Sequence, residues 1–209
     1  MTDFANQNIS EFMGLLSGAD PAPGGGGAAA LGAALGVGLA NMVASLTKGK
    51  EKYAAHEEEI IALLEAGLTL QEQLLSLIKA DAQAFLPLAE AYRLPSATDA
   101  EKAAKKRALA GASRQAAFVP LEIAEKTIKA MKITRRMGEI GSILAVSDIG
   151  CGIVFLEAAL KAARYNVLIN LSSLNDPKLE QQIRNHLQAL LTEGINITAE
   201  TVALVDGKL

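Results

Sequence analysis

Two acidic residues lie in apolar surroundings, where a charged side chain is costly unless it is paired or used. Asp148 is the one charged residue in the tract 144–155, and Asp81 is spaced between Ile78 and Phe85 so that a helix would turn it to the apolar side. Burial raises the pKa of a carboxyl group, which suits it to take and return a proton. We expect Asp148 to be the first candidate for such a role and Asp81 the second. The alternative is structural: Asp148 bonded to a neighbouring helix end, and Asp81 exposed at a helix edge.

A glycine-rich stretch is the candidate binding loop. Pro21-Ala22-Pro23 is followed by the four glycines Gly24, Gly25, Gly26 and Gly27 and then by an alanine-rich run without charge until Lys48. A glycine loop that opens a helix leaves backbone N–H groups and the positive end of the helix dipole free for an anion or a polar ligand. The Lys-Ser/Thr pair of a phosphate-binding P-loop is missing. We therefore expect residues 23–27 to bind an anion or another polar ligand, but not as a phosphate-binding P-loop.

Three further polar residues are candidates for binding. Asn166 and Asn170 are four apart, so a helix would place them on one face, where they bind a ligand or join two helices. Lys50 is a candidate partner for a ligand carboxylate or for one of the acids, with a plain surface lysine as the alternative. The helix between the glycine loop and Lys50 would be about 30 Å long. If both ends serve one ligand, a dimer is the arrangement that brings them together.

Composition excludes several kinds of site. The net charge of −3 argues against a nucleic-acid partner, which normally leaves a basic footprint. The single cysteine, Cys151, excludes an internal disulfide, and with two histidines it argues against a zinc cluster, so we expect no metal. Cys151 is expected to be a small buried core residue. Arg135 and Arg136 are expected to form a solvated pair in a short connection.

Apolar spacing predicts helices throughout the chain. The capping pair Thr98 and Glu101 marks one start, and Asp176-Pro177 marks another. For residues 166–174 a strand is the alternative, but no partner strand is present elsewhere, so continued helix is preferred. The predicted helical ranges are 3–17, 26–47, 54–92 with a kink at Pro87, 98–131 with a kink at Pro120, 141–165 with its extension, and 177–206, as one helix or a pair, interrupted or bent near Gly194.

These ranges predict one all-α domain over residues 1–209, a bundle of long, kinked helices. Because alanine and glycine on two sides of a helix bury more than one chain covers, we expect a homodimer. Residues 24–46 are uncharged and long enough to span a membrane. Their glycine and alanine content favours a closely packed buried helix instead. With no basic region at Met1-Thr2-Asp3-Phe4, no signal peptide is predicted, and we expect a cytoplasmic protein without a membrane partner.

Several short motifs follow one another in a characteristic order. They are Pro21-x-Pro23-Gly24-Gly25-Gly26, Leu46-Thr47-x-Gly49-Lys50-x-x-Tyr53, Asp81-x-x-Ala84-Phe85, Val119-Pro120, Ser147-Asp148 and Asn166-Val167-x-Ile169-Asn170. In this order they resemble the formiminotransferase-cyclodeaminase C-terminal family, which includes stand-alone methenyltetrahydrofolate cyclohydrolases. The resemblance covers about residues 4–205. It implies an all-helical homodimer that binds a tetrahydrofolate derivative and needs no metal or other cofactor.

The resemblance implies hydrolysis of 5,10-methenyltetrahydrofolate to 10-formyltetrahydrofolate. Water adds to the cationic carbon between two nitrogens, and the ring then opens. A carboxylate stabilises the cation, takes the proton of the water and returns it to the leaving nitrogen. Asp148 or Asp81 would fill this role, while the loop 23–27 would hold the pterin or the glutamate carboxylate with help from Lys50.

Two alternatives stay open: a formimidoyltetrahydrofolate cyclodeaminase, in which N10 attacks the formimino carbon and ammonia leaves, and a folate-binding helical protein without turnover. Because these 209 residues hold no transferase domain, we expect the cyclohydrolase. Two departures from the family pattern bear on substrate preference or activity. Gly138-Glu139 stands where the family has Gly-Asn, and Gly27 stands where a serine is common.

Overall fold

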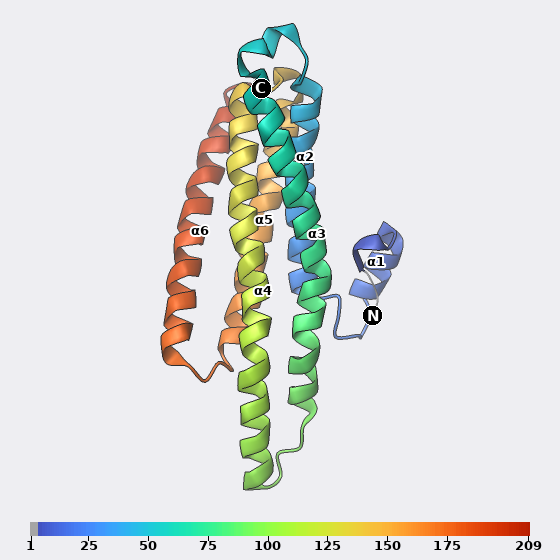
Figure 1. Ribbon diagram of the computed structural model, residues 1–209, viewed down its shortest axis with the longest axis vertical. Helices are drawn as coiled ribbons and strands as arrows, with labels where there is room; N and C mark the ends of the chain where they lie inside the picture. The colour runs from blue at the N-terminus through green and yellow to red at the C-terminus, as the bar shows by residue number, and fades with distance from the viewer. Residues whose placement is uncertain (1–3) are drawn as a thin grey trace.

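The computed structural model describes residues 4–209, and every regular element within them is helical (Figure 1). A short helix, α1, precedes five long ones, and three 3-10 segments flank them, at Phe4–Asn6, Glu51–His56 and Ile143–Ala145. The prediction of an all-helical bundle is confirmed. Residues 1–3, which include the predicted start of the first helix and most of the N-terminal stretch, lie outside the described residues. The helices are α1 (Ile9–Leu16), α2 (Gly25–Thr47), α3 (Glu57–Arg93), α4 (Asp99–Ile140), α5 (Val146–Leu171) and α6 (Pro177–Asp206).

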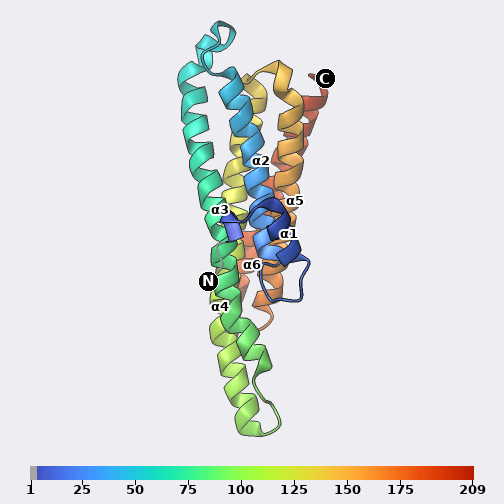
Figure 2. The ribbon, with the colours of Figure 1, turned by 90° about the vertical axis from the view of Figure 1, so that its right-hand side faces the viewer.

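Four helices, α2 to α5, pack together, and α6 lies along α4 and α5. The N-terminal segment packs on α3 and lies on the opposite side of the bundle from α6 (Figure 1). At one end α3 and α4 continue past the other helices as a pair, which we call the arm (Figures 1 and 2). Residues 94–98 join the two helices at the tip of the arm.

Helix α2 is the closely packed centre of the bundle, as its small residues predict. Its alanines and valines are buried between α3 and α5. A Cβ atom at Gly36 would lie 2.6 Å from Leu156 Cγ and 2.9 Å from the carbonyl oxygen of Gly152, which belongs to α5. Glycine at position 36 therefore allows the two helix backbones to touch.

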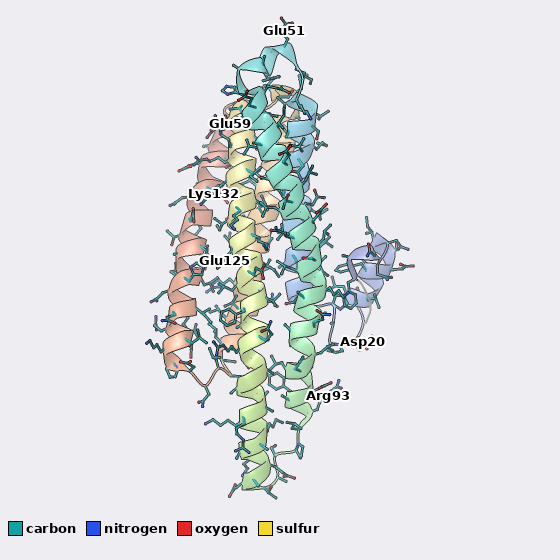
Figure 3. All side chains as sticks on the ribbon, viewed as in Figure 1. Asp20, Glu51, Glu59, Arg93, Glu125 and Lys132 are labelled. Atoms are coloured by element: carbon teal, nitrogen blue, oxygen red, sulfur yellow. The ribbon has the colours of Figure 1, made fainter. Side chains whose placement is uncertain are left out.

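Helix α4 is longer than its sequence pattern predicted. It starts with the predicted capping box of Thr98 and Glu101, but it runs to Ile140, so the prediction of a connection at residues 135–138 was wrong. Arg136 binds Glu59 of α3 at 2.6 Å and Glu139, one turn further along α4, at 2.6 Å. Ion pairs three or four residues apart stabilise a helix, so the arginines support the last turns instead of breaking them. Figure 3 shows Glu59 close to the end of the bundle opposite the arm.

Helices α5 and α6 depart from prediction in three places. Helix α5 continues through residue 166 as preferred, but it ends at Leu171. Cys151 is exposed, so the prediction of a buried cysteine was wrong. Helix α6 starts as predicted, with Asp176 as N-cap, and then passes Gly194 without interruption. A Cβ atom at Gly194 would lie 2.3 Å from Leu160 Cδ2, so this glycine serves a tight helix crossing.

Within residues 4–209, three segments are long and apolar enough to cross a membrane by length and composition alone. They are Gly25–Thr47, Glu51–Arg93 and Ile143–Leu171. In the most apolar window of Gly25–Thr47, 56% of the residues are buried within the bundle. The apolar character of this helix thus has a packing role inside the protein.

Replacement of Gly36 by alanine tests the contact between α2 and α5. The new methyl group would meet a backbone carbonyl, which cannot turn aside, so we expect Gly36→Ala to lower the free energy of unfolding by about 1–3 kcal/mol. Urea denaturation measures the change. The control is Gly111→Ala, where a Cβ atom meets nothing within 4 Å. The free energy of unfolding of that variant should rise by about 0.5–1 kcal/mol, because alanine has a higher helix propensity than glycine. Equal effects at both positions would contradict the close contact.

Candidate functional site

The glycine loop lies at the start of α2, where the sequence placed it. Gly24 is the N-cap and makes no side-chain cap, so the first N–H groups of α2 have no helical partner. Pro23 is buried, and a Cβ atom added at Gly27 would lie 3.7 Å from the Cβ atom of Pro23. Pro23 therefore packs against the first turn of α2 and supports the loop. The loop therefore presents Gly24, Gly25 and Gly26 to the adjoining cavity.

Asp81 of α3 lies directly against this glycine loop. A Cβ atom at Gly26 would be 2.1 Å from Asp81 Oδ1, so any side chain at position 26 would displace the carboxylate. Burial raises the pKa of Asp81 to about 6, while the backbone amide of Gly27 acts in the opposite direction. The structure thus places one acid, with a pKa near neutrality, at the start of α2.

Asn166 and Asn170 of α5 complete the same cavity from the other side. Asn170 Nδ2 donates to the carbonyl oxygen of Ala116 in α4 at 2.7 Å, which fixes the amide. Asn166 Nδ2 donates to Ala162 at 2.9 Å, and its amide lies 3.2 Å from where a Cβ atom of Gly25 would be. The prediction that both amides share one face is confirmed, because both line the cavity.

We call this space the active-site cavity, because it is the candidate for the active site. It has a volume of about 150 Å³, and Asp81 is its one charged lining residue within the described chain. Phe85 and Ile169 add apolar walls. A carboxylate, two oriented amides and free backbone N–H groups around one small space can bind a polar cation and exchange a proton with it.

Two predicted site residues lie elsewhere in this chain. Asp148 is in the first turn of α5, 18 residues before Asn166, which corresponds to about 27 Å along the helix. Lys50 is exposed beyond the far end of α2. The 23 residues of α2 separate Lys50 from the glycine loop by about 35 Å. Neither residue lines the active-site cavity.

The motif that includes Lys50 has a structural part in the fold. Thr47 Oγ1 accepts a hydrogen bond from the backbone N–H of Ser142 at 2.9 Å, and the Tyr53 hydroxyl accepts one from Ile143 at 3.3 Å. The side-chain hydrogen bond with Ser142 is the main cause that lowers the pKa of Tyr53. These bonds fix the turn that leads from α4 into the first turn of α5, where Asp148 lies.

Sequence reasoning did not assign six residues of the cavity wall to the site: Pro21, Ala22, Ala82, Phe85, Ala116 and Ile169. Phe85 follows Asp81 by four residues and Ile169 adjoins Asn170, so helical spacing could have found both. Ala116 gives no signal in the sequence, because only the packing of α4 brings it there. Across residues 4–209, no three His, Cys, Asp or Glu side chains gather where they could hold a metal ion.

Residues 8–189 match the sequence profile of the formiminotransferase-cyclodeaminase proteins, which is most of the chain. The chain belongs to the formiminotransferase-cyclodeaminase family. The resemblance inferred from the ordered motifs is therefore confirmed. In this chain the glycine loop, Asp81 and the two asparagines are the motif residues that the fold brings together.

Named relatives include both activities of the family. The methenyltetrahydrofolate cyclohydrolase of Methylorubrum extorquens is 35% identical over 188 residues, which are 90% of each chain. The formimidoyltransferase-cyclodeaminase of Rattus norvegicus is 32% identical over 186 residues. That match covers 89% of this chain but 34% of the rat protein, so the chain spans about a third of this relative.

A solved structure shares the whole fold. The formiminotetrahydrofolate cyclodeaminase of Thermotoga maritima superposes with a TM-score of 0.86, and the match covers 97% of both chains. Its sequence identity is 24%, so the comparison establishes the helical architecture.

The pH dependence of stability tests the burial of Asp81. Its carboxyl has a pKa of 3.8 when unperturbed and about 6 in the folded protein. The stabilising contribution of the protonated acid is therefore complete below pH 4 and is lost as the pH rises through 6. We expect the free energy of unfolding of Asp81→Asn, taken relative to that of wild type, to rise by about 1–3 kcal/mol between pH 4 and pH 8. Urea denaturation at pH 4, 6 and 8 measures this difference.

The matched control is Glu51→Gln, an exposed acid at the far end of the bundle (Figure 3). Its difference from wild type should change little with pH. A difference for Asp81→Asn that is the same at all three pH values would contradict the raised pKa.

Proposed function

We propose that this protein hydrolyses 5,10-methenyltetrahydrofolate to 10-formyltetrahydrofolate in the active-site cavity. The observation that carries the proposal is the placement of Asp81, with a pKa of about 6, against the glycine loop and beside two fixed amides. The match with a methenyltetrahydrofolate cyclohydrolase over 90% of both chains supports it. We propose that one domain, residues 1–209, carries this activity.

Asp81 is the acid–base group of this mechanism. The substrate carries a positive charge on the carbon between N5 and N10, and ionised Asp81 stabilises it, so binding favours the carboxylate form. Water attacks that carbon while Asp81 takes one of its protons. Asp81 then gives this proton to N5 as the C–N5 bond breaks, and the second proton of the water leaves to solvent as the formyl group forms. Asp81 ends the cycle ionised.

The remaining cavity groups bind and orient the substrate. Free N–H groups of Gly24, Gly25 and Gly26 point to polar atoms of the pterin, with Pro23 and Gly27 supporting the loop. Asn170 is anchored to Ala116, so its amide oxygen has a fixed direction, and Asn166 adds a second amide one turn away. Phe85 and Ile169 provide apolar contact for the rings.

Cyclodeamination is the second candidate for the same cavity. Formimidoyltetrahydrofolate reacts through a similar tetrahedral carbon between two nitrogens, with ammonia in place of water. The match with formimidoyltransferase-cyclodeaminases over 89% of this chain favours keeping it. A folate-binding protein without turnover is the outcome if neither reaction is accelerated.

We also propose that the protein is a cytoplasmic homodimer that uses neither a membrane nor a nucleic acid, and that it needs no metal or cofactor. Figure 2 shows α2 and α5 side by side on one face of the molecule. Large apolar side chains are exposed on both helices, and such surfaces mark interaction sites. We call this the α2/α5 face. Its exposed apolar residues on α2 include Leu35, Met42 and Leu46. Leu144 just before α5 and Val154, Tyr165 and Ile169 on α5 complete it.

A two-fold dimer through this face gives roles to the residues that lie far from the cavity. Ile169 belongs both to the face and to the cavity wall, so a partner would cover one side of the cavity. The face reaches from Leu144 to Ile169 along α5. If the two α5 helices are antiparallel, the partner's Asp148 and the partner's Lys50 approach this cavity. That arrangement is the alternative in which Asp148 supplies the catalytic carboxylate.

The decisive kinetic test compares Asp81→Asn with Asp148→Asn. We expect Asp81→Asn to lower kcat/KM by about 10²–10⁴-fold at pH 8, because the general base is lost. For wild type, kcat/KM should rise with pH through about 6 and then level off. Loss of methenyltetrahydrofolate absorbance above the buffer rate measures both.

Three outcomes would change the assignment. Full activity in Asp81→Asn with loss in Asp148→Asn would transfer the catalytic role to Asp148. Release of ammonia from formimidoyltetrahydrofolate without hydrolysis would establish the cyclodeaminase. Folate binding without acceleration of either reaction would leave a binding protein.

The dimer is tested with charged substitutions on the α2/α5 face. We expect wild type to have twice the chain mass of 21.8 kDa in sedimentation equilibrium. Leu35→Glu combined with Tyr165→Glu should halve it, because two charges would be buried in the interface. Ile195→Glu, at an exposed position on α6, is the matched control and should stay dimeric. Circular dichroism confirms that each variant remains helical, and a monomeric wild type would refute the dimer.

A further inference from the structure

A pocket lined by three lysines lies close to the active-site cavity and has no part in the mechanism above. We call it the lysine pocket. It has a volume of about 380 Å³ and lies between the first turns of α4 and the segment that joins α5 to α6. Lys102, Lys105 and Lys106 line one side. Hydroxyl and amide groups of Ser96, Ser172, Ser173 and Asn175 line the rest.

The positive charge of this pocket is largely uncompensated. Among the residues that the structure describes, no carboxylate lines it. Lys102 pairs at 3.0 Å with Asp99, whose side chain is fully exposed. Lys105 donates to two carbonyl oxygens at the end of α3, at 2.8 and 2.9 Å, and neither partner is a carboxylate. Lys106 has no hydrogen-bond or ion-pair partner within residues 4–209. A ligand with more than one negative charge fits this lining.

The lysine pocket and the active-site cavity lie along one strip of surface. Lys102, Leu109 and Ala116 are spaced seven residues apart on α4, so they share one helix face. Leu109 lines the lysine pocket and Ala116 lines the active-site cavity, about 10 Å apart along the axis. On the opposite wall, Asn170 belongs to the cavity and Ser172, two residues later, to the pocket.

The two ends of this strip have opposite charge. Asp81 is the charged residue of the cavity, and three lysines are the charged residues of the pocket. A methenyl folate has the complementary pattern, with a cation at its one-carbon bridge and two carboxylates on its glutamate. Its p-aminobenzoyl ring and glutamate together are about as long as three extended residues, about 10 Å. Length and charge therefore both match.

We propose that the lysine pocket binds the glutamate carboxylates of a folate whose pterin and one-carbon bridge occupy the active-site cavity. This inference rests on the proposed function. Lys102 and Lys106 donate charge-assisted hydrogen bonds to the carboxylates. Lys105 holds the end of α3 and adds to the positive field. The pocket thereby sets the direction in which the substrate lies, with its reacting carbon beside Asp81.

The test compares a substrate with and without the glutamate. We would measure kcat and KM for 5,10-methenyltetrahydrofolate and for 5,10-methenyltetrahydropteroate, which lacks the glutamate and ends in a single benzoate carboxylate. Wild type should prefer the folate by about tenfold in kcat/KM, mostly through KM, and added salt should reduce this preference. The double variant Lys102→Ala/Lys106→Ala should lose most of the preference, with kcat within about twofold and the pteroate unaffected.

Lys132→Ala is the matched control. Lys132 is an exposed lysine further along α4, paired with Glu193 at 2.7 Å, and it lies outside the lysine pocket (Figure 3). Its substrate preference should equal that of wild type. A double variant that keeps the full preference for the folate would overturn this inference and leave the proposed function standing.

Calorimetry separates this inference from turnover. If wild type turns over neither substrate, the proposed function fails, and binding of 5-formyltetrahydrofolate and 5-formyltetrahydropteroate then decides the matter. Tighter binding of the folate that disappears in Lys102→Ala/Lys106→Ala supports the glutamate site. Equal binding of the two ligands by wild type, or a preference that the double variant keeps, refutes it.

Discussion

The close approach of α2 to its neighbours is the constraint on which the other features depend. At Gly36 the backbone of α2 touches that of α5, and at Gly26 it leaves just enough room for the Asp81 carboxylate of α3. Larger side chains at either position would push the helices apart. The same series of small residues therefore packs the bundle and makes the space in which an acid can lie against a helix start. Stability and catalytic geometry share one cause.

The energetics of Asp81 follow from that closeness. Burial favours the protonated acid and the Gly27 amide favours the carboxylate, and burial is the larger effect. An ionised Asp81 destabilises the empty protein. In the proposed reaction, a cationic substrate would supply the missing opposite charge and relieve this electrostatic penalty. Enzymes commonly place such destabilised groups at their active sites.

Much of this architecture is readable from residue spacing, because helical periodicity is local. Thr98 with Glu101 and Asp176 with Pro177 mark helix starts correctly, and the spacing of Asn166 and Asn170 places both amides on one face. Tertiary pairing is different. The neighbouring sequence does not show that Arg136 pairs with Glu59 of another helix. The last turns of α4 therefore look like a connection in the sequence. Cys151 lies in an apolar tract, yet it is exposed on α5, because the apolar residues around it in the sequence do not determine which face of the helix is covered.

The same limit applies to the site. Spacing identifies Asp81 and Asp148 equally well, but it cannot tell which acid meets the glycine loop, because that depends on how α3 and α5 lie beside α2. Within a single chain, the fold places Asp81 in the cavity with the glycine loop, whereas Asp148 lies at the other end of α5 from Asn166 and Asn170. Lys50 is separated from the loop by the full length of α2, as the sequence already required.

Because of the arm, the free energy needed for local opening differs along the long axis of the molecule. In the body, each helix contacts several others, whereas the end of the arm consists of α3 and α4 alone (Figures 1 and 2). A helix pair buries less surface per residue than a bundle, so local opening there requires less free energy than opening of the body. Amide hydrogens near residues 94–98 should therefore exchange through sub-global fluctuations, while those of α2 require global unfolding. The active-site cavity lies at the start of α2 in the body, whereas the lysine pocket includes Ser96 at the tip of the arm. A molecule bound across both would join the weakly coupled arm to the cooperative body, and protection from exchange would extend toward the tip.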